Sequence, residues 1–241
     1  MSDVFGRQPV LEALRSGREV NKLLVVKGQR QGSIREILAL AKDLGIVVQE
    51  VERVVLDKIS AGANHQGVVA QLADVRYWSL EELLAKPCTP DWPPFLLLLD
   101  GIQDPHNLGS ILRSAEALGV DGVIIPERRA VGVTGTVMKS SAGAANYVPV
   151  CRVTNIPSTM ETLKKMGYWL VGADMSGDPC YTQDLTGAIA VVIGGEGSGL
   201  SRLVKEKCDF LSSIPMRGQV NSLNASVAAA LLLFEVTRQR G

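Results

Sequence analysis

The sequence is poor in the residues that bind metal ions. It contains only two histidines in 241 residues, which argues against a multi-histidine metal centre. Its four cysteines, Cys88, Cys151, Cys180 and Cys208, lie at least 28 residues apart. That spacing fits neither a CxxC zinc site nor a compact disulfide framework. We therefore expect reduced thiols in a cytoplasmic protein that uses no metal.

Long hydrophobic runs and an excess of either charge are also missing. The longest apolar stretches, FLLLL and AAALLLF, are far too short to cross a bilayer. The N-terminus, MSDVFGRQPV, has no apolar segment of the secretory type. Together with a hydrophobic content of 46% and a charged content of 21%, this predicts a soluble globular protein without a membrane partner.

The net charge is zero, which by itself argues mildly against a nucleic-acid partner. The cations are, however, unevenly distributed. Lys22, Lys27, Arg30 and Arg35 fall in a stretch without any acid, and a second group around position 130 has one acid. That second group consists of Arg128, Arg129 and Lys139, against Glu127. Both groups fit an RNA-binding surface or an ordinary solvated face.

A proline-rich segment divides the chain. Residues 85–94, AKPCTPDWPP, hold four prolines in their last eight positions, which disfavours both helix and inner strand. We predict a domain at 1–74, a linker at 75–94 that contains a short helix near 79–85, and a domain at 95–241.

Both predicted domains alternate strands and helices. The first carries strands at 22–27, 46–51 and 67–72 with helices at 33–45 and 53–60 between them. The second carries strands at 95–100, 122–126, 147–150, 168–173, 188–194 and 210–215, with helices at 105–118, 134–141, 156–166, 200–207 and from Ala225 onward. This is an α/β pattern with a mostly parallel sheet, and ligands bind such sheets beyond the carboxyl ends of the strands.

Three of those strand ends lead into unusual loops. In the first, Asp104 and Pro105 can start a helix whose outward side carries Arg113. Gly109 lies inside the first turns of that helix, where glycine costs about 0.5–1 kcal/mol relative to alanine. The glycine indicates that something approaches the backbone beside Arg113, although an ordinary surface arginine fits the pattern too.

The second loop, GGEGSG at residues 194–199, follows a strand and is rich in glycine. It matches neither GxxxxGK[ST] nor GxGxxG, and Glu196 at its centre would repel a phosphate. The pattern favours a neutral or cationic ligand against the backbone. The alternative is a plain tight turn with a surface glutamate.

The third loop precedes the last helix and brings together Asn221, Ser222, Asn224 and Ser226. A helix cap accounts for one or two of these polar side chains. The others are available for a ligand or a neighbouring loop.

Together, the three loops resemble the three motifs of the SpoU (TrmH-like) class of RNA ribose 2′-O-methyltransferases. The patterns are N-x-G-x-I-x-R from Asn107 to Arg113, G-x-E-x-x-G-L from Gly194 to Leu200, and S-L-N-x-S from Ser222 to Ser226. The segments VFGRQPVLEAL and NHQGVVA resemble the small substrate-binding domain of the family. The subgroup most similar to this sequence modifies a guanosine of bacterial large-subunit ribosomal RNA.

The resemblance implies a C-terminal Rossmann-like SPOUT domain with a trefoil knot, behind a small N-terminal α/β substrate-binding domain. It also implies S-adenosylmethionine as methyl donor, structured RNA as substrate, and a homodimer formed through the C-terminal domain and its last helix. The implied catalytic residues are Arg113, Asn107, Glu196, Ser222 and Asn224. Main-chain groups of Gly194, Ile214 and Leu223 would hold the donor, with Gly195, Gly199 and Ser222 beside them.

Arg113 is the proposed base of the family, but arginine stays protonated in proteins. A clamp on the target phosphate is the alternative role. Three other functions remain open at this stage. They are a tRNA ribose methyltransferase, a non-catalytic RNA-binding module on the same fold, and a dinucleotide-dependent oxidoreductase, against which the missing GxGxxG argues.

Overall fold

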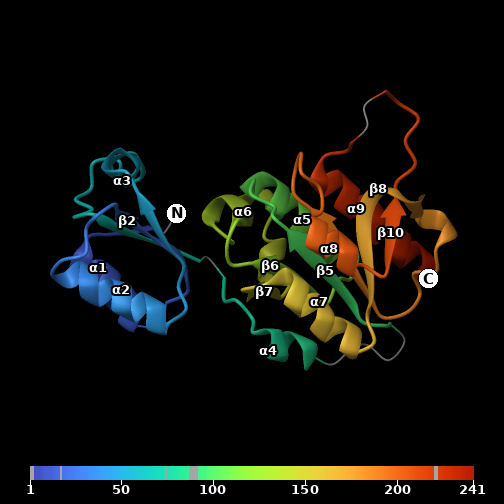
Figure 1. The fold of residues 1–241 in the computed structure, drawn as a ribbon, viewed down its shortest axis with the longest axis horizontal. Helices are drawn as coiled ribbons and strands as arrows, with labels where there is room; N and C mark the ends of the chain where they lie inside the picture. Colours follow the sequence, from blue (N-terminus) through green and yellow to red (C-terminus); the bar gives the residue numbers. More distant parts are fainter. Residues whose placement is uncertain (1–2, 17, 74, 87–91, 220–221) are drawn as a thin grey trace. The chain divides into compact units, whose positions relative to one another are not determined.

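The computed structural model describes residues 3–16, 18–73, 75–86, 92–219 and 222–241. These residues form two compact units, Met1–Arg76 with Gly132–Gly135, and Tyr77–Val131 with Thr136–Gly241. In Figure 1, where colours follow the sequence, the first unit runs from blue to teal apart from its segment Gly132–Gly135, and the second unit runs from teal to red. The two-part α/β organisation predicted from the sequence is confirmed.

The N-terminal unit is a four-stranded mixed sheet between helices. Its strand order is β1-β4-β2-β3, with β2 and β3 parallel and the other pairs antiparallel. Leu23 packs with α1 and α2, while its neighbour Leu24 packs with α3, because successive strand residues face opposite sides. The elements are β1 (Asp3–Phe5), α1 (Arg7–Arg15), β2 (Val20–Val26), α2 (Ser33–Asp43), β3 (Val48–Val51), α3 (Arg53–Ser60) and β4 (Val68–Leu72).

The C-terminal unit is built on a six-stranded sheet in which every strand pair is parallel, with the order β10-β8-β9-β5-β6-β7. Its strands are β5 (Phe95–Asp100), β6 (Gly122–Pro126), β7 (Val150–Val153), β8 (Trp169–Pro179), β9 (Ile189–Gly194) and β10 (Phe210–Ser213). Its helices are α4 (Leu80–Leu84), α5 (Pro105–Ala117), α6 (Gly135–Ser140), α7 (Ile156–Lys165), α8 (Arg202–Lys207) and α9 (Ala225–Arg240), with single 3-10 turns η1 (Ala144–Asn146) and η2 (Cys180–Thr182).

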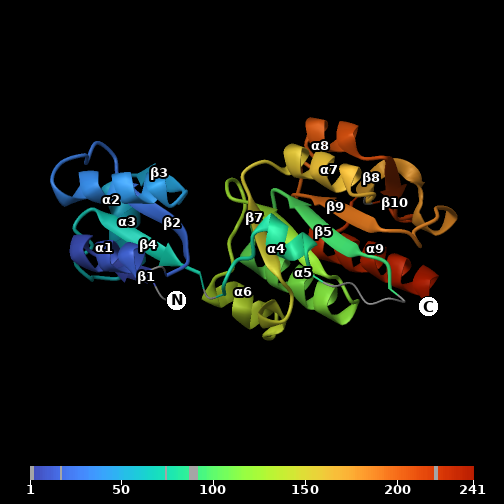
Figure 2. The same cartoon turned by 90° about the horizontal axis from the view of Figure 1, so that it is seen from below.

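Helices cover both faces of this sheet, as Figure 2 shows. Helices α7 and α8 pack on one face through Met160 and Val204, against Leu96 and Leu98 of β5. On the other face α5 and α9 lie side by side, and Thr237 of α9 donates to the backbone oxygen of Leu118 at 3.1 Å. Strands buried on both faces explain the continuous apolar run of β5.

The segment predicted as a linker differs from the expectation. The short helix is present as α4, and Ser79 and Glu82 form a capping box at its start. Leu83 is only 3% exposed and packs in the core under α7, so α4 belongs to the C-terminal unit and is not a spacer. Residues 87–91, which include Pro87 and Pro90, lie outside the described residues.

One strand was also misplaced. The prediction at 147–150 is wrong, because β7 runs from Val150 to Val153. Tyr147 is 78% exposed, and Pro149 has no N–H to offer a ladder, so regular pairing with β6 begins after the proline. The trefoil knot implied by the resemblance stays a prediction.

Candidate active site

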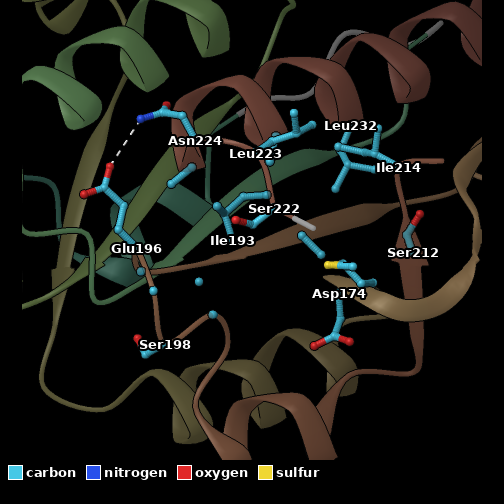
Figure 3. A pocket seen from close by; sticks show the side chains of 18 of the residues that line it. Asp174, Ile193, Glu196, Ser198, Ser212, Ile214, Ser222, Leu223, Asn224 and Leu232 are labelled. Atoms are coloured by element: carbon cyan, nitrogen blue, oxygen red, sulfur yellow. Dashed lines mark hydrogen bonds between the residues drawn. The ribbon is translucent and has the colours of Figure 1, made fainter. Parts of the chain in front are cut away.

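A cavity of about 680 Å³ opens at the carboxyl ends of β8, β9 and β10, next to the start of α9. Figure 3 shows its lining, with Asn224 and Glu196 joined at one end and Ile214 and Asp174 at the other. The position beyond the strand ends is the one predicted for a ligand site on this sheet. The lining consists of residues 173–175, 193–199, Ser212, Ile214, Met216, residues 222–225, Ala228 and Leu232.

Three polar side chains from the three predicted motifs meet at the edge of this cavity. Asn224 Nδ2 donates to Asn107 Oδ1 at 3.0 Å and to Glu196 Oε1 at 3.3 Å. Asn107 in turn donates from Nδ2 to the same carboxylate oxygen of Glu196. Asn107 is 7% exposed, so this cluster is anchored from the protein side while Glu196 and Asn224 face the cavity.

Asn224 has a second task, which answers why the last helix begins with so many polar groups. Its Oδ1 accepts hydrogen bonds from Ser226 N at 2.9 Å and Val227 N at 3.4 Å, and so caps α9. Its Nδ2 is left to bind Asn107 and Glu196. One side chain therefore caps the start of the helix and orders the site. Ser222 lines the cavity, and Asn221 lies outside the described residues.

The four glycines of the second loop serve two different purposes. A Cβ on Gly194 would lie 2.1 Å from the backbone of Gly199, and one on Gly195 would lie 2.7 Å from Gly101 O. These two positions exclude a side chain because the chain packs against itself. Gly197 and Gly199 have φ of 76° and 63°, a conformation that favours glycine, and open space around them. The tight-turn interpretation thus accounts for the glycines, and the cavity adds a ligand site beside them.

Asp174 also lines the cavity, and the sequence prediction missed it. It lies in a bulge of β8, and its carboxylate accepts from Lys205 Nζ at 2.8 Å and from Ser176 N at 2.9 Å. Burial alone would raise the pKa of Asp174, but the hydrogen bonds from Lys205 and Ser176 outweigh it and hold the pKa below its usual value. The one sequence signal was an acid directly after the strand predicted at 168–173.

The bulge itself depends on Gly177. A Cβ at this position would lie 2.3 Å from the backbone carbon of Leu211 in β10. The register between β8 and β10 shifts at Leu211 and Ser212, which leaves residues 173–177 to form the wall of the cavity. The Asp174–Lys205 ion pair and Gly177 together hold this wall in place.

The charge of the lining restricts the ligand. Among the described residues that line the cavity, the only ionisable side chains are the carboxylates of Asp174 and Glu196. Such a cavity disfavours phosphate and suits a neutral or cationic ligand, as the glycine-rich loop predicted.

The structure brings nearly all predicted site residues together. Gly194, Gly195, Gly199, Ile214, Leu223, Ser222, Glu196 and Asn224 line the cavity, and Asn107 is bonded to two of them. Arg113 is the exception, because it lies away from the cavity of its own chain. It is exposed on α5, does not line the cavity, and makes no hydrogen bond or ion pair with another residue in the described part of the chain.

Gly109 has a structural explanation instead of a ligand. A Cβ there would lie 1.9 Å from Ser140 Oγ and 3.0 Å from Ser141 N, because α6 packs directly on the first turns of α5. Ser140 Oγ donates to Pro105 O at 3.2 Å and ties the two helices together. The predicted close approach is real, but the approaching group is another helix of the same chain.

The cationic stretch of the N-terminal unit contains no acidic residue, but acids from a later part of the chain lie beside two of its cations. Lys27 Nζ lies 2.7 Å from Glu52, and Arg30 lies 3.0 Å from Glu50. Strand β3 runs parallel to β2 and supplies Glu50, and Glu52 follows directly as the N-cap residue of α3. Of the four predicted cations, Lys22 and Arg35 have no ion pair with another described residue.

Two family models match the chain. The model described as "SpoU rRNA Methylase family" matches residues 94–234. The model described as "RNA 2'-O ribose methyltransferase substrate binding" matches residues 4–78. The chain belongs to the SpoU rRNA methylase family. This SpoU protein is therefore an RNA methyltransferase with a separate substrate-binding domain, as its motifs predicted.

Curated relatives agree with this family. The SpoU protein is 50% identical over 238 residues to a TrmH family tRNA/rRNA methyltransferase of Staphylococcus saprophyticus, covering 98% of this chain and 95% of the relative. It is 48% identical over 238 residues to YacO of Bacillus subtilis, named in the same way, with the same coverage. Both names leave the RNA open between tRNA and rRNA.

Solved structures place the fold in the same group. The SpoU methyltransferase AviRb from Streptomyces viridochromogenes, in complex with AdoMet, has a TM-score of 0.62 and 30% identity, covering 99% of this chain and 90% of that one. An AdoMet-bound rRNA methyltransferase from Sinorhizobium meliloti has a TM-score of 0.62 and 25% identity, covering 98% and 86%.

Other kinds of site are absent from the described residues. No group of three or more histidine, cysteine, aspartate or glutamate side chains there could hold a metal ion. No helix in the described ranges is long and apolar enough to cross a membrane. Cys151, Cys180 and Cys208 are free thiols, as predicted, and burial raises the pKa of Cys151 and of Cys208 to about 12. Cys88 lies outside the described residues.

Proposed function

We propose that this SpoU protein transfers a methyl group from S-adenosylmethionine to the ribose 2′-hydroxyl of a guanosine in large-subunit ribosomal RNA. The observation that carries the proposal is the polar cluster of Asn107, Glu196 and Asn224 at the edge of an acid-lined cavity. The donor carries a sulfonium, an ammonium and a carboxylate group, so its net charge is positive. The lining suits this charge, because Asp174 is paired with Lys205 and the carboxylate of Glu196 has no basic partner among the described residues. The neighbour AviRb binds the same donor.

The residues present fit the donor. Gly194, Ile214 and Leu223 line the cavity, which supports the proposal that their main-chain groups hold the donor. When bound, S-adenosylmethionine supplies an electrophilic methyl group. The protein must then align the ribose hydroxyl with this methyl and remove or polarise its proton. Asn107, Glu196 and Asn224 form a fixed set of donors and acceptors that can orient the nucleotide, with Ser222 beside them.

Arg113 acts in this proposal as a clamp on the target phosphate. Its guanidinium is exposed and has no carboxylate partner among the described residues, so its planar fork is available to a phosphate. The phosphate or a water then takes the proton of the hydroxyl. A base role for Arg113 remains the alternative.

The N-terminal unit grips the RNA away from the target nucleotide, in line with the family model that matches residues 4–78. The C-terminal unit forms a homodimer through α9. Val227, Leu231 and Phe234 recur at helical spacing on α9 and are 45%, 43% and 54% exposed. A second copy would remove this apolar stripe from water.

Mapping of ribose methylation in RNA from a strain that lacks the gene tests the proposal. Loss of one 2′-O-methylguanosine in large-subunit ribosomal RNA is the expected result. Loss of a methyl group in tRNA instead would establish the tRNA alternative, which the names of the relatives include. No change in any RNA, together with no methyl transfer by the purified protein, would leave the non-catalytic RNA-binding module.

A further inference from the structure

Gly101 joins the cavity to a second loop that carries two arginines. On one side, Gly195 N donates to Asp100 O at 2.9 Å, and a Cβ on Gly195 would lie 2.7 Å from Gly101 O. On the other side, a Cβ on Gly101 would lie 3.8 Å from Arg129 O. The backbone of Gly101 thus lies between the loop that carries Glu196 and the loop that follows β6.

The loop after β6 is fixed in this position. Val131 N donates to Ile102 O at 2.9 Å, which ties residues 127–131 to the segment that enters α5. Strands β5 and β6 are parallel neighbours, so their carboxyl ends lie at one edge of the sheet. That edge also carries Asn107, in the first turns of α5. The two arginines are therefore built into the edge at which the polar cluster forms.

Arg128 and Arg129 are both exposed, and neither side chain has a hydrogen bond or ion pair with another described residue. Two cations of the N-terminal unit differ in this respect, because Lys27 pairs with Glu52 and Arg30 pairs with Glu50. Glu127, the nearest acid in sequence, offers its backbone oxygen to Arg152 at 3.2 Å. Within the described ranges, no carboxylate pairs with either of these two adjacent guanidinium groups.

The backbone at Arg129 is held in an unusual conformation. Its φ is 59°, in the left-handed region, which is unfavourable for any residue other than glycine. Such strain persists where the surrounding structure enforces it, and it is concentrated at functional sites. Here the hydrogen bond from Val131 N to Ile102 O fixes the segment that follows Arg129.

We propose that Arg128 and Arg129 bind backbone phosphates of the target RNA next to the methylated ribose. The guanidinium fork matches phosphate oxygens in geometry and charge, and phosphate contacts fix the position of a nucleic acid. This inference rests on the proposed function for the identity of the bound polymer. It assigns to the C-terminal unit an RNA contact of its own, separate from the substrate-binding domain.

The test compares two full-length double variants that each remove two positive charges. Arg128→Gln/Arg129→Gln changes the proposed contacts. Lys165→Gln/Arg202→Gln is the matched control on α7 and α8, which cover the face of the sheet away from α5. Affinity for unmodified transcripts of large-subunit ribosomal RNA and of tRNA is measured between about 50 and 200 mM salt. Donor affinity is measured by calorimetry, and methyl transfer is measured with each transcript.

We expect the Arg128→Gln/Arg129→Gln variant to bind RNA more weakly, with a slope of log affinity against log salt that is shallower by about 1.4, at about 0.7 per lost contact to single-stranded RNA. The KM for RNA should rise more than kcat falls, and donor affinity should match that of the wild type. The control should keep the wild-type slope. Arginine-to-lysine changes at both positions should restore the slope and only part of the affinity, because a point charge replaces a fork.

The phosphate assignment would be overturned if the wild type transfers methyl groups but the double variant keeps the wild-type salt slope and the wild-type KM for RNA. That outcome would leave the proposed function intact. Polyglutamate serves as a probe for binding of an acidic protein. If it displaces RNA from the wild type but not from the variant, and both transfer methyl groups equally well, the two arginines bind an acidic protein instead of RNA. A wild type that binds neither transcript and methylates neither would overturn the proposed function and this inference with it.

Discussion

Asn224 Nδ2 donates to Asn107 Oδ1 at 3.0 Å, although the two residues lie 117 positions apart in the chain. The same nitrogen reaches Glu196, and the Oδ1 of Asn224 caps α9. The order of the site and the start of the last helix therefore depend on one side chain, and substitutions can separate the two tasks.

The first prediction separates capping from site order at Asn224. Asn224→Ser should keep α9 stable, because serine caps about as well as asparagine, but it removes the amide that binds Asn107 and Glu196. Methyl transfer should fall at least tenfold with little change in thermal unfolding. Asn224→Ala should in addition cost about 0.5–2 kcal/mol of stability. Equal activity in the serine variant and the wild type would show that the cluster is not needed.

The second prediction concerns Arg113. Arg113→Ala should abolish methyl transfer and leave the unfolding free energy within about 0.5 kcal/mol of the wild type, since the side chain is exposed and unpaired in the described part of the chain. Calorimetry should find donor affinity unchanged. Arg113→Lys should fail as well, because an ammonium does not reproduce the guanidinium fork. A nearly active lysine variant would contradict both roles discussed for this residue.

Mixing two inactive variants tests how Arg113 reaches the chemistry. Arg113 lies outside the cavity lining of its own chain, and a homodimer is proposed. Chains with Arg113→Ala mixed with chains carrying Asn224→Ser should recover part of the activity if a site is composed from two copies. No recovery in a mixture shown to contain heterodimers would place Arg113 on the RNA-facing side of its own site.

The third prediction tests the packing of Gly109. Gly109→Ala should destabilise the protein by about 1–3 kcal/mol despite the better helix propensity of alanine, because its Cβ would meet Ser140 Oγ at 1.9 Å. Ser110→Ala, on the exposed side of the same turn, is the matched control and should be near neutral. Urea unfolding measures both. The double change Gly109→Ala/Ser140→Gly should recover part of the loss, and a fully stable single variant would refute the contact.

The fourth prediction concerns Asp174 and pH. Asp174→Asn removes the ion pair with Lys205, so it should lower both stability and donor affinity, and Lys205→Met should have a similar effect. The folded-state pKa of Asp174 lies below its ordinary value of about 3.9. Its stabilising contribution is therefore complete above that value and is lost as the pH falls through the folded pKa. The free energy of unfolding of the wild type and of Asp174→Asn is measured from neutral pH down to about pH 3. The difference between the two should shrink only at the acid end. A difference that stays constant over the whole range would argue against the ion pair.

The fifth prediction concerns the boundary of the C-terminal unit. A chain that begins at Tyr77 should keep the donor site and lose much of its RNA affinity, because the substrate-binding domain is removed. A chain that begins at Asp91 should in addition be unstable, because it lacks Leu83 of α4, which is buried against the core under α7. Thermal unfolding of both chains, with donor titration, checks this. Equal stability would mean that α4 is dispensable after all.

Much of the fold could be predicted because the residues within a short stretch of sequence are enough to favour a strand or a helix there. Strand β5 follows from an apolar run, α5 from Asp104 and Pro105, and α9 from a polar cap before an apolar helix. The three motifs identified the family and supplied residues 194–199 and 222–225 of the cavity lining, whereas residues 173–175 of β8 were not predicted as site residues. Such features depend on neighbours within a few residues, which a single sequence displays.

Contacts between distant segments were decided by the tertiary structure. Only the strand order brings Asn107, Glu196 and Asn224 within hydrogen-bonding distance, and only the packing of α6 on α5 explains Gly109. The pairing of Lys27 with Glu52 follows from the parallel neighbours β2 and β3. Residue patterns along one segment report which side of it is buried and not which partner buries it. The sequence by itself therefore determined most of the elements, the family and the chemistry of each loop, although it did not predict β1 or α1 and misplaced β7. The packing of remote elements determined which of those groups meet.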